Sequence, residues 1–195
     1  MDHLYMEMEK NYKMSYFKAP ITNKRPETES VSLFDVYQLI RGQRFVHQTQ
    51  ELRTISDAGK RRDYKGGHFD YITPSGVFSY CKDDALIEHS SLLCIDLDSL
   101  GESLDKVKKK LLTDPIFETL LMFRSPSGDG LKWFTEIDLN RCDHRTWFAA
   151  VRNYLMSTYE LTDKQVDKSC SNPSKACFLC FDPDVYIKTE LIEKN

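Results

Sequence analysis

The sequence lacks the features that mark several large classes of protein. None of its apolar runs approaches the roughly 20 residues that a membrane-spanning helix needs, and its first residues lack the apolar segment of a secretory signal. Only 8 glycines and 7 prolines are present, with no internal repeat and no glycine- and serine-rich linker. We therefore expect no membrane partner and a cytoplasmic location, where the six cysteines stay reduced.

Length and composition predict one folded domain. A chain of 195 residues is within the usual range of a single domain, and 41% hydrophobic and 12% aromatic residues argue against disorder. The polar residues 1–13 are expected to form a flexible N-terminus, and residues 14–195 the domain. Residues 1–65 hold 12 of the 27 basic and 9 of the 30 acidic residues, so this first third is basic and the remainder acidic. This asymmetry fits a phosphate-bearing partner, although ordinary surface variation explains it as well.

The spacing of apolar residues predicts an α+β protein. For residues 14–88 it predicts a strand at 14–21, a helix from Ser30 or Ser32 to about Arg41, a helix at 45–62, and a hairpin of 69–73 with 77–80.

From residue 89 onward the predicted order is β-α-β-β-α-β, which is typical of an RRM-like (ferredoxin-like) module over residues 89–187. Residues 91–95 and 119–123 are apolar on both faces of their strands, so we expect residues 14–88 to form an α/β module across the sheet. The predicted strands are 91–98, 119–124, 131–137 and 176–181, and the predicted helices are 102–112 and 143–160.

A pair of aspartates ends the first of these strands. Asp96 and Asp98 are two positions apart, so their side chains should point to the same face of the sheet. Carboxylates in this arrangement repel each other unless a cation lies between them, and Mg²⁺ or Mn²⁺ prefers such oxygen ligands. The alternative is a strand that ends in a solvated acidic loop.

The turn between the second and third strands has a composition suited to binding phosphate. It contains Ser125, Ser127, Gly128 and Gly130 and leads into Lys132. Glycines let the backbone approach a ligand closely, and hydroxyls, amides and an ammonium group bind phosphate oxygens. The spacing is not that of a Walker A loop, and an ordinary hairpin turn explains the glycines equally well.

Two residues near the last strand could complete such a site. In a split β-α-β fold the first and last strands can be neighbours, so Asp167 could supply a third carboxylate and Lys175 a phosphate ligand. Each is alternatively a simple surface charge.

The remaining candidates are a basic segment and a group of cysteines. The segment is Lys60, Arg61 and Arg62 with Lys65, which could bind nucleic-acid phosphates or form a solvated helix end. Cys177 and Cys180 form a C-x-x-C pair, but no second pair lies at the spacing of a zinc finger. We expect these two and Cys170 to be core thiols without zinc.

Taken together, these motifs resemble the archaeo-eukaryotic primase (primase-polymerase) superfamily. The segments CIDLD, SPSGDGLKWF and VDKSCSNPSKACFLCFDPDVYI occur in the superfamily's order, and ITNKRPETESVSLFDVYQLI and DYKGGHFDYITPSGVFSYC are similar to its VirE-type N-terminal domain branch in bacterial mobile-element proteins. The resemblance covers about residues 14–187.

The resemblance implies metal-dependent nucleotidyl transfer on a single-stranded nucleic-acid template during mobile-element replication. It implies that Asp96, Asp98 and Asp167 bind Mg²⁺ or Mn²⁺ and that the 125–132 segment and Lys175 bind the nucleoside triphosphate. It also implies a helicase partner, in a separate chain or a C-terminal region. Lys132 stands where active primases have histidine, and Lys175 where arginine is more usual.

Two other functions stay open. The domain could have kept the fold without catalysis and serve to bind nucleic acid or replication proteins, because a lysine cannot reproduce the geometry of an imidazole. It could also be an interaction domain with no nucleic-acid role, since this fold hosts many functions.

Overall fold

The computed structural model describes residues 12–193 as an α+β fold with three antiparallel sheets. The predicted flexible N-terminus therefore lies almost entirely outside the described residues, and Tyr12, at its end, is already buried. The strands are β1 (Ser15–Phe17), β2 (Tyr71–Thr73), β3 (Gly76–Phe78), β4 (Leu86–His89), β5 (Leu92–Leu97), β6 (Leu121–Arg124), β7 (Leu131–Glu136), β8 (Cys177–Phe178) and β9 (Tyr186–Ile187).

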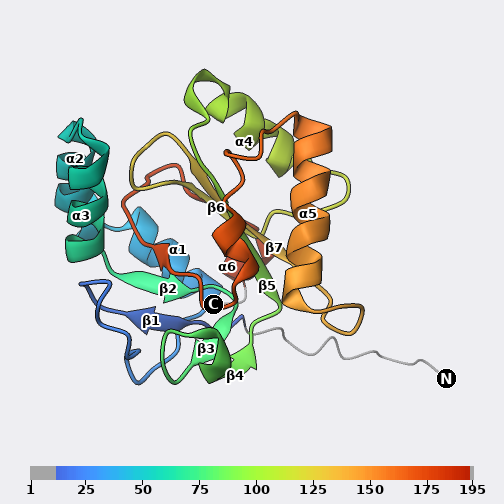
Figure 1. Cartoon of the computed structure of the whole chain (residues 1–195), viewed down its shortest axis with the longest axis horizontal. Helices are drawn as coiled ribbons and strands as arrows, with labels where there is room; N and C mark the ends of the chain where they lie inside the picture. Colours follow the sequence, from blue (N-terminus) through green and yellow to red (C-terminus); the bar gives the residue numbers. More distant parts are fainter. Residues whose placement is uncertain (1–11, 194–195) are drawn as a thin grey trace.

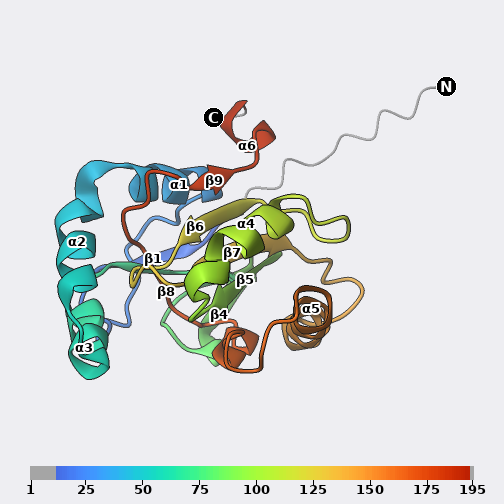
Figure 2. The ribbon, with the colours of Figure 1, turned by 90° about the horizontal axis from the view of Figure 1, so that it is seen from above.

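Helices flank the sheets at both ends of the molecule, with α2 and α3 at one end and α5 at the other (Figures 1 and 2). The α-helices are α1 (Leu33–Arg41), α2 (Val46–Thr54), α3 (Ala58–His68), α4 (Leu104–Leu112), α5 (His144–Tyr159) and α6 (Glu190–Glu193). The 3₁₀ helices are η1 (Gln43–Phe45), η2 (Asp83–Ala85), η3 (Gly101–Ser103) and η4 (Lys168–Ser171).

The central sheet has the order β5-β7-β6-β9. Along the chain, β5, α4, β6, β7 and α5 follow one another in the predicted β-α-β-β-α order. The last predicted strand, residues 176–181, is wrong in both length and place: β8 covers only Cys177–Phe178 and pairs with β2 in the sheet β1-β2-β8. The outer edge of β5 is instead met by a single bridge between Leu97 and Val166.

Both faces of the central sheet are covered, as its apolar strands require. One face packs against α4 and α5 through side chains that include Ile95, Trp133, Val107 and Val151. The other face packs against the N-terminal residues through a core that includes Phe134, Phe123, Met14, Val36 and Ile40. The N-terminal module therefore lies across the sheet.

Candidate functional site: a cluster of carboxylates and lysines

Asp96 and Lys132 form an ion pair between β5 and β7 of the central sheet. They are directly opposite each other on the antiparallel strands β5 and β7, so their side chains share a face. This is the face of Cys94 and Phe134, which the N-terminal module covers. Asp96 is only 5% exposed and Lys132 only 7%, so each charge depends on the other for compensation.

Asp167 joins this pair from the edge of β5. The segment before η4 runs alongside β5, with the Asp98 amide donating to the Gln165 carbonyl and the Asp167 amide to the Asp96 carbonyl. Val166 points into the core under α4 and α5, so alternation turns the next side chain to the opposite face. Ligand atoms of Asp96, Asp167 and Cys170 all lie within 4.8 Å of one another.

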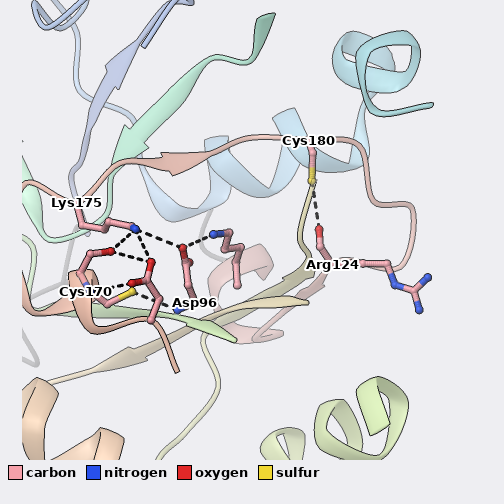
Figure 3. Close-up of polar contacts among 8 residues, drawn as sticks. Asp96, Arg124, Cys170, Lys175 and Cys180 are labelled. Atoms are coloured by element: carbon pink, nitrogen blue, oxygen red, sulfur yellow. Dashed lines mark hydrogen bonds and ion pairs between the residues drawn. The ribbon is translucent and has the colours of Figure 1, made fainter. Parts of the chain in front are cut away.

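Lys175 bridges the two carboxylates. Its ammonium nitrogen lies 2.6 Å from Asp167 Oδ2 and 3.9 Å from Asp96 Oδ2, and it also donates to the Ser169 hydroxyl (Figure 3). Burial alone would raise the pKa of Asp167, but hydrogen bonds from Lys175 and Ser169 hold the pKa at about 2. For Lys175, burial lowers the pKa, and the nearby Asp96 and Asp167 outweigh burial and raise it. Both groups are therefore charged at neutral pH.

Asp98 and Lys65 complete the cluster. Burial raises the pKa of the half-buried Asp98; Lys132 and Lys65 oppose this rise, and Asp96 and Asp167 add to it. Lys65 comes from α3 of the N-terminal module, where burial and the charge of Lys132 lower its pKa. The cluster thus holds three carboxylates and three ammonium groups, and its charges balance within the protein.

The turn of residues 125–130 packs against the end of β5. A side chain at Gly130 would place its Cβ 2.2 Å from the Leu97 carbonyl oxygen and 3.3 Å from the Asp98 Cα, so only glycine allows this approach. Gly128 has φ +86°, a conformation that favours glycine. The Ser125 hydroxyl is buried without a hydrogen-bond partner, and Ser127 is half-buried. The turn is therefore adjacent to the carboxylate cluster.

The basic segment is only partly near this site. Lys60, Arg61 and Arg62 lie in the first turns of α3, because the predicted helix 45–62 is divided into η1, α2 and α3 and a new helix begins after Asp57. Only Lys65, about one turn further along, is close enough to interact with the charges of Asp96 and Asp98. The other three basic side chains face outward to different degrees.

Several residues of the site carry no local sequence signal. Arg53 on α2 donates to the carbonyls of Ser125 and Pro126 and so holds the turn. His89 and His144, which are 55 positions apart, form a ring-to-ring hydrogen bond of 3.1 Å, and His144 also contacts the Cys170 carbonyl. These contacts join residues that are far apart in the sequence, so the spacing of residues did not predict them.

Carboxylate oxygens are suitable ligands for Mg²⁺ or Mn²⁺, and Asp96, Asp167 and the adjacent Asp98 supply them. The buried Cys170 thiol is a poor ligand for such hard ions, and burial together with Asp96 raises its pKa well above the ordinary value. Lys132 and Lys175 now neutralise the carboxylates, so a metal would have to displace their ammonium groups.

A comparison with known protein families gives a match over most of the site. Residues 66–187 fit the family described as BT4734-like, N-terminal domain, which is more than half of the chain. The chain belongs to this family. The family segment includes all three aspartates, the 125–130 turn, Lys132 and Lys175, and it begins directly after Lys65. No curated protein and no solved structure matches the chain. Within residues 12–193, no helix has the length and apolar character to cross a membrane.

Proposed function

We propose that this BT4734-like domain is a primase-polymerase-like nucleotidyltransferase of the archaeo-eukaryotic primase superfamily, in its VirE-type branch, acting in mobile-element replication. The observation that carries the proposal is the approach of Asp96, Asp167 and the nearby Asp98 on one face of the sheet, beside a glycine-rich turn. The strand order β5-β7-β6, with α4 and α5 on one face, supports an RRM-like module.

Each part of the site has a role in this proposal. The three aspartates would bind Mg²⁺ or Mn²⁺, which supplies activation of a primer 3′-hydroxyl and stabilisation of the leaving pyrophosphate. Lys132, Lys175 and the 125–130 turn would bind the triphosphate of an incoming nucleotide. The basic residues of α3 would bind phosphates of a single-stranded template, and a helicase, in the same or another chain, would act with the domain in the cytoplasm.

In this proposal Lys132 and Lys175 have two alternative anionic partners. One is the aspartate with which each lysine is paired in the structure, and the other is the triphosphate of the nucleotide. A triphosphate carries more charge than a carboxylate, so it should attract Lys132 and Lys175 away from Asp96 and Asp167. The released carboxylate oxygens would then be free for a divalent ion. Nucleotide and metal should therefore bind cooperatively to this site.

Incorporation of labelled nucleotides on a primed single-stranded template, with Mn²⁺ or Mg²⁺, tests the proposal. Asp96→Asn and Asp167→Asn should each reduce incorporation by about 100-fold or more, because each removes a charge that stabilises the transition state through the metal. Asp105→Asn is the matched control, since the Asp105 side chain is 80% exposed on α4. Incorporation that is insensitive to both site variants would contradict this function.

A second candidate is a domain that binds nucleic acid without catalysis. The internal balance of charges, and above all the buried Asp96–Lys132 pair, favours it, because the cluster is satisfied without any metal. Binding of a labelled oligonucleotide across a salt series tests this function. Replacing Arg61 and Arg62 with alanine should reduce the salt slope by about 1–2, whereas replacing the exposed Lys106 and Lys109 of α4 should not.

The two assays together separate the candidates. Binding without incorporation would support the second function. Absence of both would leave an interaction domain with no nucleic-acid role.

A further inference from the structure

Ser174, the residue before Lys175, is held at all of its polar groups by one short segment of the N-terminal module. Its amide donates to Asp83 Oδ1 at 3.0 Å and its hydroxyl to the same oxygen at 2.6 Å. Its carbonyl accepts a hydrogen bond from Cys81 Sγ at 3.5 Å. These contacts join positions more than 90 residues apart, so they form only in the folded protein.

Asp83 is itself fixed on its other side. Its second oxygen, Oδ2, accepts from the Arg145 guanidinium at 2.8 Å, and Arg145 is in the first turn of α5. Burial raises the pKa of Asp83, but the hydrogen bonds from Ser174 and Arg145 outweigh burial and lower it. Asp83 is therefore an ionised carboxylate, and hydrogen bonds to ionised acceptors are stronger than neutral ones.

The position of the Lys175 side chain depends on a fixed backbone at the preceding residue, Ser174. A lysine side chain has four rotatable bonds and loses conformational entropy when it is held in one position. The Lys175 amide is bound to the Asn172 carbonyl in a tight turn, and its ammonium group reaches Asp167, Ser169 and Asp96. A displaced backbone at Ser174 would move the ammonium group away from these partners.

We propose that Asp83 is a positioning residue that fixes the backbone of Ser174 and thereby places the Lys175 ammonium group between Asp96 and Asp167. The hydrogen bonds of Asp83 come from Ser174 and Arg145 and none comes from the described residues of the carboxylate cluster, so Asp83 acts on Lys175 through Ser174. The consequence for substrate is that Asp83 sets how well Lys175 binds the triphosphate, and this consequence rests on the proposed function.

The positioning itself is testable without any ligand. In protein carrying ¹⁵N-labelled lysine, exchange of the Lys175 ammonium protons with water reports how firmly the group is held. Asp83→Ala should accelerate this exchange about fivefold or more, because it removes the two charge-assisted hydrogen bonds from Ser174 together with the one from Arg145. Ser174→Ala, which removes only one of them, should have a smaller effect and is the milder variant if Asp83→Ala folds poorly.

Two internal comparisons make this result specific. Asp84→Asn is the matched control, because Asp84 is the next residue, is 74% exposed and forms an ion pair with nearby Lys82. Lys132, which is held by Asp96 across the strands, should keep its exchange rate in every variant. Unchanged Lys175 exchange in a folded Asp83→Ala variant would overturn the proposal, and so would equal acceleration at Lys132 and Lys175.

A double-mutant cycle tests the consequence for substrate. With Mn²⁺ and a non-hydrolysable nucleoside triphosphate, Asp83→Ala should weaken binding about tenfold when Lys175 is present, because it removes both hydrogen bonds that hold Ser174. It should cause no further loss in the Lys175→Ala background. Equal losses in both backgrounds would show that Asp83 does not act through Lys175. Absence of nucleotide binding by the unaltered protein would contradict the proposed function, whereas the exchange measurement would still decide the positioning.

Discussion

At the scale of single residues, the unusual feature is a buried lysine whose ammonium group neutralises a buried aspartate. Lys132 is buried in a sheet, where an isolated ammonium group would be very costly, and Asp96 lies opposite it on the next strand. Burial lowers the pKa of Lys132, but Asp96 outweighs burial and raises it well above the ordinary value. The burial of Lys132 therefore depends on Asp96, and Lys175 adds a second, more distant ammonium group beside Asp96.

Removing one member of this pair should be costly for stability. Lys132→Met keeps the length of the side chain and removes the nearer ammonium partner of the buried Asp96, which keeps Lys175 at 3.9 Å, so we expect a loss of up to about 3–5 kcal/mol in the free energy of unfolding. Urea denaturation measures this change. Lys106→Met, at an exposed position of α4, should change stability by less than about 0.5 kcal/mol. A similar small change at Lys132 would contradict the buried pair.

The pair of His89 and His144 is a second case in which residues compensate one another. The Ser91 amide donates to His89 Nδ1, and His144 Nε2 faces the Cys170 carbonyl, so it must be a donor. His89 Nε2 then donates to His144 Nδ1, and both rings are neutral. Burial and the partner ring lower the pKa of His89 from 6.5 to about 4. Burial also lowers the pKa of His144, against opposing effects of the Cys170 carbonyl, Asp83 and Asp143.

This pair predicts acid sensitivity. Between pH 6.5 and about 4 the unfolded chain binds a proton at His89 that the folded protein does not. Stability is therefore complete above about pH 6.5 and falls as the pH falls towards 4. We expect a loss of about 2 kcal/mol between pH 7 and pH 5, measured by urea denaturation. His89→Gln should flatten this dependence, whereas His47→Gln, at a side chain 88% exposed, should not.

At the scale of elements, local patterns located most helices but not all strand partners. Ser32 caps α1 with Asp35 in a capping box, one of the two predicted caps, and Asp143 caps α5. The predicted hairpin of 69–73 and 77–80 is wrong: β2 pairs with β1 and β8, and β3 pairs with β4, which the apolar pattern did not show. Strands of three or four residues have too few positions to specify a partner locally.

Replacing two glycines with alanine tests how closely the 125–130 turn approaches β5. Gly130→Ala would force the Leu97 carbonyl away at the join of the turn and β5, and we expect a loss of about 1–3 kcal/mol in stability. Gly67→Ala is the matched control, because nothing lies within 4 Å of its added Cβ on α3. It should stabilise the protein by about 0.5–1 kcal/mol through helix propensity. Thermal unfolding of both variants checks this pair, and a neutral Gly130→Ala would contradict the close approach.

At the scale of the whole molecule, the central sheet depends on residues outside the family segment. One face of β5, β6 and β7 is covered by side chains that include Met14 of the N-terminal stretch and Leu33, Val36 and Ile40 of α1. These residues precede the matched range 66–187. Lys65, which reaches the carboxylate cluster, precedes it as well. Core and site are thus both completed by the first third of the chain.

A shortened chain should show this dependence. Residues 66–187 alone would expose an apolar sheet face, so we expect weak or absent cooperative unfolding and strong binding of a hydrophobic dye. The full chain, measured in parallel, should unfold in one cooperative transition. Calorimetry and dye fluorescence compare the two chains. A shortened chain that unfolds cooperatively at a similar temperature would show that the segment is self-sufficient.

The sequence by itself determined those features of the fold that depend on residues close to one another along the chain. The alternation around Asp96 and Asp98, the amphipathic stripes of α1 and α4 and the caps at Ser32 and Asp143 are local, so they could be predicted from spacing. The apolar strands also indicated that both faces of the sheet are covered. The hypothesis that Asp167 lies near Asp96 depended on the expected strand order, and these two side chains do approach each other.

Only the tertiary structure decided which charges compensate which. Lys132 pairs with Asp96 because of the register between β5 and β7, and Lys175 reaches Asp167 because Asp83 holds Ser174. Within the segment 176–181, Cys177 and Phe178 pair with β2, and Cys177, Leu179 and Cys180 pack in the core that includes the N-terminal module. Such contacts join distant parts of the chain, and their free energy depends on burial, which no local pattern records.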